Sequence, residues 1–224
     1  MIFAVASLLL AEKPLRTPDE RFRGLPDYPF RAHYVTVEGK RMHYVDEGKG
    51  DVVLMLHGEP SWSYLYRKII PVVAQGSRVI APDLIGFGKS DKLREKSDYT
   101  FEMHFAALKS FVEKRKLRNI TLVCQDWGGL LGLALVGEMP DRFARLIVMN
   151  TGLPTGEKPG PAFLQWRAFA AQQTDMNVGD VLERGTFSNL TPTVRAAYDA
   201  PFPDKTYKAC AHQFPLLVPI SKDD

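Results

Sequence analysis

The sequence predicts an α/β protein with a mostly parallel, twisted sheet flanked by helices, and with a helical cap over the sheet. Three observations carry this prediction. Short apolar runs of strand length alternate with segments of helical spacing up to about residue 152. Several of these runs are almost continuously apolar, as in strands buried on both faces. Beyond residue 152 the strand pattern stops and the chain becomes helical in spacing and rich in aromatic residues. Such alternation is typical of parallel strands joined by helical crossovers.

Six strands are expected, separated by turn-forming residues. The first two form a hairpin, because Glu38-Gly39-Lys40 lies between them as a short turn. The third strand ends in His57-Gly58-Glu59-Pro60, and the fourth is followed by a glycine-rich loop. The expected strands are residues 34–37, 41–45, 51–56, 78–81, 119–125 and 145–149.

Three helices are expected between the strands. Residues 64–74, 101–116 and 129–138 carry apolar side chains at helical spacing or form compact apolar runs after a strand. Thr100 is well placed to cap the second helix, since threonine is a favoured N-cap residue. The side chains expected on the inner face of that helix are Phe101, Phe105, Leu108 and Val112.

The domain organisation follows from a change of composition at residues 152–161, which are rich in proline and glycine and are typical of a linker. The helical segment that follows is interpreted as a cap inserted over the sheet. The expected divisions are an N-terminal extension (1–30), the core with its six strands (31–152), the cap (153–215) and the start of a return to the core (216–224).

The composition argues against several kinds of partner. The net charge of the 224-residue chain is +3, and its basic residues are scattered among acidic ones, so nucleic acid is not expected as a partner. Two cysteines are too few for a disulfide framework, which favours a reduced, cytoplasmic setting. The apolar residues 2–11 are too short to span a membrane, although they have the length of a signal-peptide core, so export is the alternative. No metal and no cofactor are expected.

The strongest chemical signal is Cys124-Gln125-Asp126-Trp127-Gly128-Gly129, between an expected strand and an expected helix. A sharp strand-to-helix turn that exposes its central side chain requires small residues two positions away, and Cys124 and Gly128 meet this requirement. Asp126 is therefore the candidate nucleophile, and a carboxylate can displace a leaving group from saturated carbon to form an ester. The alternative is that Asp126 only caps the helix.

A second loop supports the catalytic interpretation. It follows the third expected strand and would face Asp126, so that the backbone N–H groups of Glu59 and Trp127 would together form an oxyanion hole. His57, beside a glycine at a strand end, is expected to be a structural hydrogen-bonding residue rather than a base. Trp62 is expected to pack in the interior.

Three runs together resemble the haloalkane dehalogenases of the α/β-hydrolase fold: residues 57–67, 81–91 and 125–129. The resemblance extends from about residue 17 onward and points to the branch with Glu after His-Gly. It implies cleavage of a haloalkane to an alcohol and a halide through an ester on Asp126, with water as second substrate. It also implies that Trp127 and Trp166 bind the halide, because an indole N–H donates a hydrogen bond without reacting. Packing on the core is the alternative for Trp166.

The resemblance also raises a question of completeness. In part of the family an acid follows the sixth strand, where this sequence has Asn150, so the branch whose acid follows a later strand is implied. That acid and the catalytic histidine would lie beyond the cap, so the chain is expected to be truncated and its activity is left open. His104 and His212 are expected to be surface or packing residues, and Asp199 a solvated acid.

Two other functions remain open from the sequence. An epoxide hydrolase would share the Asp nucleophile and the cap, with Tyr198 and Tyr207 as possible donors to the epoxide oxygen. The chain would otherwise be a catalytically incomplete fragment or a protein that keeps the pocket only for binding. The oligomeric state is not predicted.

Overall fold

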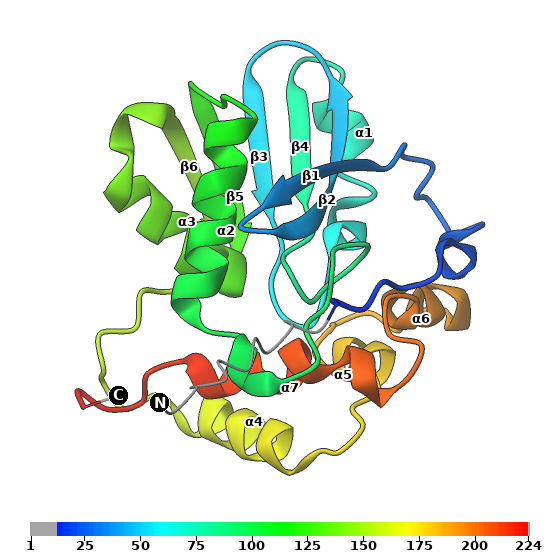
Figure 1. Ribbon diagram of the computed structural model, residues 1–224, viewed down its shortest axis with the longest axis vertical. Helices are drawn as coiled ribbons and strands as arrows, with labels where there is room; N and C mark the ends of the chain where they lie inside the picture. Colours follow the sequence, from blue (N-terminus) through cyan, green and yellow to red (C-terminus); the bar gives the residue numbers. More distant parts are fainter. Residues whose placement is uncertain (1–12, 224) are drawn as a thin grey trace, which may run out of the picture.

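The predicted fold class is confirmed by the computed structural model, which describes residues 13–223 (Figure 1). Its six strands form one sheet in the order β1-β2-β4-β3-β5-β6. The apolar residues 2–11 discussed above lie outside the described residues. The strands are β1 (His33–Val37), β2 (Lys40–Gly48), β3 (Val52–Leu56), β4 (Arg78–Pro82), β5 (Ile120–Gln125) and β6 (Phe143–Met149).

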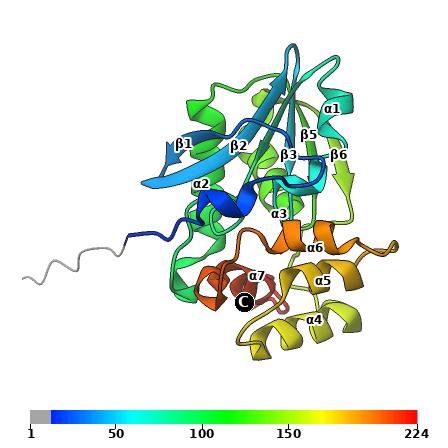
Figure 2. The same ribbon diagram turned by 90° about the vertical axis from the view of Figure 1, so that its right-hand side faces the viewer.

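The sheet is parallel from β4 to β6, whereas β1 and β2 are antiparallel to their neighbours. The chain crosses from β3 to β4 in one direction and from β4 to β5 in the other. Right-handed crossovers then place α1 (Ile70–Val73) on one face, and α2 (Phe101–Lys114) and α3 (Trp127–Glu138) on the opposite face (Figure 2). The direction reverses between β3 and β5, and in open α/β sheets a ligand binds at the carboxyl ends of the strands at such a point.

The prediction of one continuous helix over residues 64–74 is wrong. The chain forms a short 3₁₀ turn (Ser63–Tyr66) and then α1, with Pro71 at the start of the helix. Proline lacks an N–H and clashes with the carbonyl four residues earlier, so it favours the first turn of a helix, which is where Pro71 lies in α1. The other 3₁₀ turns are Asp19–Phe22, Lys96–Asp98, Pro140–Arg142 and Lys205–Tyr207.

Thr100 caps α2 as expected, with its hydroxyl accepting a hydrogen bond from the N–H of Met103 at 3.1 Å. The buried face of α2 differs from the expected one, because His104 lies inside and Phe105 is only partly buried. The His104 ring packs against Phe214, with the ring centroids 4.5 Å apart. Burial lowers the pKa of His104 to about 3, so this histidine is neutral and has the packing role.

Four further helices lie together beyond one end of the sheet (Figures 1 and 2). They are α4 (Pro161–Gln172), α5 (Val178–Arg184), α6 (Pro192–Asp199) and α7 (Ala209–Leu217). Trp62 ties this layer to the core, because its indole N–H donates to the carbonyl of Ala197 at 3.2 Å. Asp199 is half-buried and accepts the N–H of Gly179 at 2.9 Å, so the expectation of a solvated acid is wrong. The exact division into domains stays a prediction.

The strand β6 forms one edge of the sheet and is the most exposed part of it. Leu146, Ile147, Val148 and Met149 are 39–49% exposed. A parallel strand with apolar side chains usually has both faces covered, so the exposure of these side chains on β6 is unusual for such a strand.

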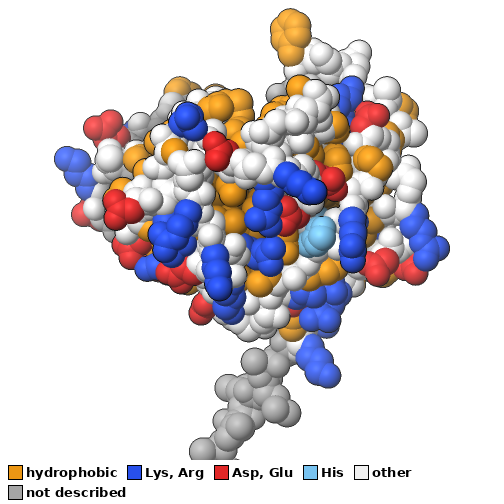
Figure 3. Space-filling model, turned by 90° about the horizontal axis from the view of Figure 1, so that it is seen from above, with side chains coloured by type: hydrophobic (Ala, Val, Ile, Leu, Met, Phe, Trp, Pro, Cys, Tyr) orange, Lys and Arg blue, Asp and Glu red, His pale blue; other side chains and the backbone are white. Residues whose placement is uncertain are grey.

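Basic and acidic side chains are interspersed on the face seen from above (Figure 3). Among residues 13–223, no helix has both the length and the apolar character needed to cross a membrane. The same residues contain no group of three or more His, Cys, Asp or Glu side chains arranged to hold a metal ion.

Candidate active site

Asp126 lies at the sharp turn between β5 and α3, with backbone angles φ 50° and ψ −130°. This conformation is unfavourable for a residue with a Cβ, and such strain is typical of functional sites. Gly128 makes the turn possible: a Cβ there would lie 2.2 Å from the carbonyl oxygen of Leu56. The Asp126 side chain makes no capping hydrogen bond to α3, so the alternative role as an N-cap is not seen.

Neighbouring backbone and side chains hold this turn in place. The N–H of Asp126 donates to the carbonyl of Asn150 at 3.3 Å, and the Thr151 hydroxyl donates to the carbonyl of Asp126 at 2.7 Å. On the other side, Gly58 lies directly against the carboxylate, where a Cβ would be 2.3 Å from Oδ1. The carboxylate is therefore fixed from the loops after β3 and β6.

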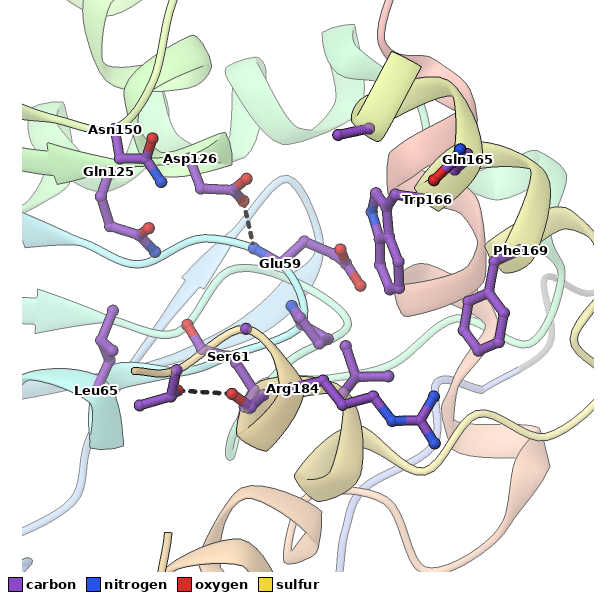
Figure 4. A pocket seen from close by; sticks show the side chains of 16 residues that line it. Glu59, Ser61, Leu65, Gln125, Asp126, Asn150, Gln165, Trp166, Phe169 and Arg184 are labelled. Atoms are coloured by element: carbon purple, nitrogen blue, oxygen red, sulfur yellow. Dashed lines mark hydrogen bonds between the residues drawn. The ribbon is translucent and has the colours of Figure 1, made fainter. Parts of the chain in front are cut away.

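The two N–H groups predicted for the oxyanion hole converge on this carboxylate. The N–H of Glu59 donates to Oδ1 of Asp126 at 2.7 Å (Figure 4). Burial raises the pKa of Asp126 above its ordinary value of 3.8, and the backbone N–H groups of Trp127 and Glu59 oppose that rise. A buried carboxylate with few donors is a stronger nucleophile than a solvated one, because less solvation is lost when it reacts.

His57 supports the Glu59 loop and does not face the carboxylate. Its Nδ1–H donates to the carbonyl of Gly58 at 2.9 Å, and its Nε2 accepts the N–H of Leu84 at 2.9 Å. Burial lowers the pKa of His57, which keeps the ring neutral. This geometry matches the structural role expected from the sequence.

Asp83 ties the loops after β3 and β4 together. Its Oδ1 accepts the N–H of Ser63 at 2.8 Å. Its Oδ2 accepts the Nδ1–H of His43 at 2.7 Å and the N–H of Lys89 at 2.8 Å. Asp83 and His43 are both buried, so this hydrogen-bonded group stiffens the platform on which Glu59 lies.

Two cavities meet at Asp126 and Glu59, between the sheet and the cap helices. The larger has a volume of about 820 Å³ and the smaller about 450 Å³. Trp166 lines both, and Trp127 lines the smaller. The remaining residues of the larger cavity include Leu65, Gln125, Asn150, Gln165, Phe169, Val181, Leu182 and Arg184. A cavity of this size, lined by both apolar and polar side chains, accommodates a small organic molecule.

The two tryptophans reach this space from different layers. Trp127 follows the nucleophile and packs against Phe214 of α7, with ring centroids 4.3 Å apart. Trp166 lies on α4 and stacks on Phe169 at 5.7 Å. Within residues 13–223 neither indole N–H has a hydrogen-bond partner, so both are available to a ligand.

The relationship to known proteins agrees with this geometry. A family model described as the alpha/beta hydrolase fold matches residues 51–191. A haloalkane dehalogenase from Psychrobacter cryohalolentis is 53% identical over 95% of this chain and 73% of its own length. One from Mycolicibacterium paratuberculosis is 50% identical over 94% of this chain and 73% of its own length. The chain belongs to the haloalkane dehalogenase family.

Solved structures support the same family membership. The tetrameric haloalkane dehalogenase from Paraglaciecola agarilytica superposes with a TM-score of 0.91 at 47% identity, covering 95% of this chain and 74% of that one. A haloalkane dehalogenase from Agrobacterium tumefaciens superposes with a TM-score of 0.76 at 28% identity, covering 84% of this chain and 68% of that one. The predicted resemblance to this family is thereby confirmed.

The tyrosines that an epoxide hydrolase would use do not line these cavities in this member of the dehalogenase family. Tyr198 is buried, accepts a hydrogen bond from Arg67 at 3.4 Å and packs edge-on against Tyr64. Tyr207 lies in a 3₁₀ turn before α7 and is also absent from both linings. The geometry around Asp126 thus provides indole donors rather than phenol donors.

Sequence reasoning missed some of the cavity lining. The Glu59 carboxyl, Gln125 and Arg184 all face the larger cavity, although only the backbone of Glu59 was assigned a role. The sequence could have identified the Glu59 carboxyl, because an acid in the loop expected to form the oxyanion hole must either face the site or be paired with another group. No sequence signal identifies Arg184, because its location depends on how α5 packs.

Proposed function

We propose that this chain cleaves carbon–halogen bonds by nucleophilic displacement at Asp126. The single observation that carries the proposal is the partly buried Asp126 carboxylate at a strained turn, which lines the same cavity as Trp127 and Trp166, whose indole N–H groups have no partner within residues 13–223. Family membership supports the reaction class, and the local geometry supports the roles of individual residues.

In the proposed first step a carboxylate oxygen of Asp126 attacks the halogen-bearing carbon. A carbon–oxygen bond forms, and the carbon–halogen bond breaks with both electrons leaving on the halide. Trp127 and Trp166 would donate hydrogen bonds to the developing anion from either side of the cavity. Because negative charge moves from Asp126 to the halide, donors near both positions are needed during the step.

In the proposed second step water attacks the carboxyl carbon of the Asp126 ester, releasing the alcohol and a proton and regenerating the carboxylate. The oxyanion of this step develops on Asp126 itself. Glu59 N–H already lies 2.7 Å from Oδ1, so it is positioned to stabilise that charge, together with the N–H of Trp127.

Activation of that water needs a general base. None of the histidines in the described part of the chain lines either cavity. For this polypeptide we therefore expect the ester on Asp126 to accumulate, with halide release stopping at one equivalent per chain.

The test is incubation with 1,2-dibromoethane followed by intact-mass spectrometry and bromide determination. The proposal predicts one bromoethyl adduct on a peptide containing Asp126 and one equivalent of bromide. The matched control is Asp126→Asn, which keeps the shape of the turn but cannot act as the nucleophile and should stay unmodified. Continuous bromide release would show that the chain also completes hydrolysis. The absence of both the adduct and bromide release would overturn the proposal.

A further inference from the structure

The side chain of Glu59 is not explained by the oxyanion role of its backbone. From the loop after β3 it extends into the cavity toward the side on which Trp166 lies (Figure 4). It lines both cavities together with Asp126 and Trp166. Its Oε1 is shielded from water and has no hydrogen-bond partner within residues 13–223. Glu59 is partly buried, and an ionised carboxylate with one oxygen shut off from water and without a donor would be a costly arrangement.

The surroundings of Glu59 favour its neutral form. Burial, and secondarily the charge of Asp126, raise the pKa of Glu59 well above its ordinary value of 4.5. Cys210 on α7 lies close enough to interact electrostatically with Glu59, and burial raises the pKa of the Cys210 thiol, which keeps it neutral. His57 in the same loop is neutral as well. The cation on α5 that lines the larger cavity, Arg184, is exposed to solvent and makes no ion pair with Glu59.

We propose that Glu59 is a third halide-binding residue: a neutral carboxylic acid whose O–H donates to the departing halide beside the indoles of Trp127 and Trp166. This rests on the function proposed above. The carboxyl group lies in the cavity shared by the nucleophile and Trp166, where the anion has to depart. An ionised Glu59 would instead repel that anion.

The charge balance of the reaction is consistent with a proton that stays on Glu59. Before the displacement, Glu59 lies beside one negative charge, on Asp126. After it, Asp126 is a neutral ester and the negative charge is on the halide in the same cavity. A negative charge next to Glu59, which favours the protonated acid, is therefore present before and after the displacement. The O–H of Glu59 can turn toward Asp126 in the first state and toward the halide in the second.

The proposal predicts that halide binding depends on pH in a defined way. Bromide affinity, measured by quenching of tryptophan fluorescence, should be constant at low pH. It should then fall about tenfold for each pH unit above the pKa of Glu59, because only the neutral acid donates. In Glu59→Gln the amide N–H is a permanent donor of similar shape, so the fall in bromide affinity above the pKa of Glu59 should disappear, and any pH dependence that remains should follow the ionisation of Asp126.

Bromide titrations from about pH 5 to about pH 9 on the wild-type chain and Glu59→Gln test this. The proposal is overturned if wild-type affinity is independent of pH, or if Glu59→Gln shows the same pH dependence as the wild type. Infrared difference spectroscopy on the wild type is the second measurement. The carbonyl band of a neutral carboxyl should be present at neutral pH and absent from Glu59→Gln, and its absence from the wild type would contradict the proposal.

The outcomes separate this proposal from the proposed function. A bromoethyl adduct on Asp126 together with pH-independent bromide binding would remove the donor role of Glu59 and leave the nucleophile in place. Absence of both the adduct and bromide binding would overturn the dehalogenation proposal itself.

Discussion

Substituting Gly58 by alanine should displace the nucleophile without altering it chemically. A Cβ on Gly58 would lie 2.3 Å from Oδ1, 2.4 Å from Cβ and 2.7 Å from Cγ of Asp126. Nonbonded carbon atoms keep about 3.5 Å apart, so the carboxylate or the loop must shift by roughly 1 Å. A misplacement of about 1 Å costs on the order of 100-fold in rate, because the attacking atom leaves its near-attack position. The shift would also lengthen the 2.7 Å hydrogen bond from the Glu59 N–H.

The assay is the rate of adduct formation on Asp126 with 1,2-dibromoethane, followed by intact mass, with thermal unfolding of the same samples. Gly137→Ala is the matched control, because no atom lies within 4 Å of a Cβ at that position and alanine favours a helix by about 1 kcal/mol over glycine. We expect Gly58→Ala to react about 100-fold more slowly while remaining folded, and Gly137→Ala to react like the wild type. Adduct formation at the wild-type rate in Gly58→Ala would refute the reasoning that this contact positions the carboxylate.

Three further outcomes are expected. Asp83→Ala leaves the N–H of Ser63 and the imidazole of His43 without their buried acceptor and should lower the unfolding free energy by about 3–5 kcal/mol in urea denaturation. Burial by itself would raise the pKa of Asp83, but the interaction with His43 holds that pKa below 3.8. The stabilisation that ionised Asp83 gives to the wild type should therefore be present above pH 3.8 and be lost as the pH falls through the lower pKa of the folded state. If the difference in unfolding free energy between the wild type and Asp83→Ala did not change with acid pH, this would be contradicted. The alkylation rate should fall tenfold per pH unit below the pKa of Asp126, which lies above 3.8, and a rate independent of pH down to that value would exclude a raised pKa. Ile147→Lys on the exposed edge strand should increase solubility without changing the alkylation rate, as measured by light scattering, and unchanged scattering would show that this edge does not drive association.

The sheet and the nucleophile turn were predictable because local sequence determines them. Apolar runs define most of the strands and a short turn defines the first hairpin, and a small residue on each side of Asp126 is a steric requirement of the turn that any strand-to-helix elbow imposes. The cap of α2 by Thr100 is equally local. These features depend on residues a few positions apart, so their signal survives in the sequence itself.

Other features depend on contacts between distant segments and were missed or incomplete. His104 is buried because α7 covers that side of α2, and Asp199 is half-buried because it caps the neighbouring α5. Neither pairing has a signal in the local sequence. The continuous helix expected over residues 64–74 failed for a local reason, since Pro71 favours the start of a helix and is costly in its interior.

The position of Asp126 connects fold and chemistry through a single topological fact. Because β3 and β5 are neighbours and the chain leaves them in opposite directions, the loops after both strands must approach each other at the carboxyl end of the sheet. One loop supplies Glu59 with its N–H and its carboxyl, and the other supplies the nucleophile with Trp127. The two acids therefore share one buried space, where only one of them can remain charged at low cost. Asp126 has two backbone donors, whereas the Oε1 atom of Glu59 has no partner within residues 13–223, so the charge belongs on Asp126 and the proton on Glu59.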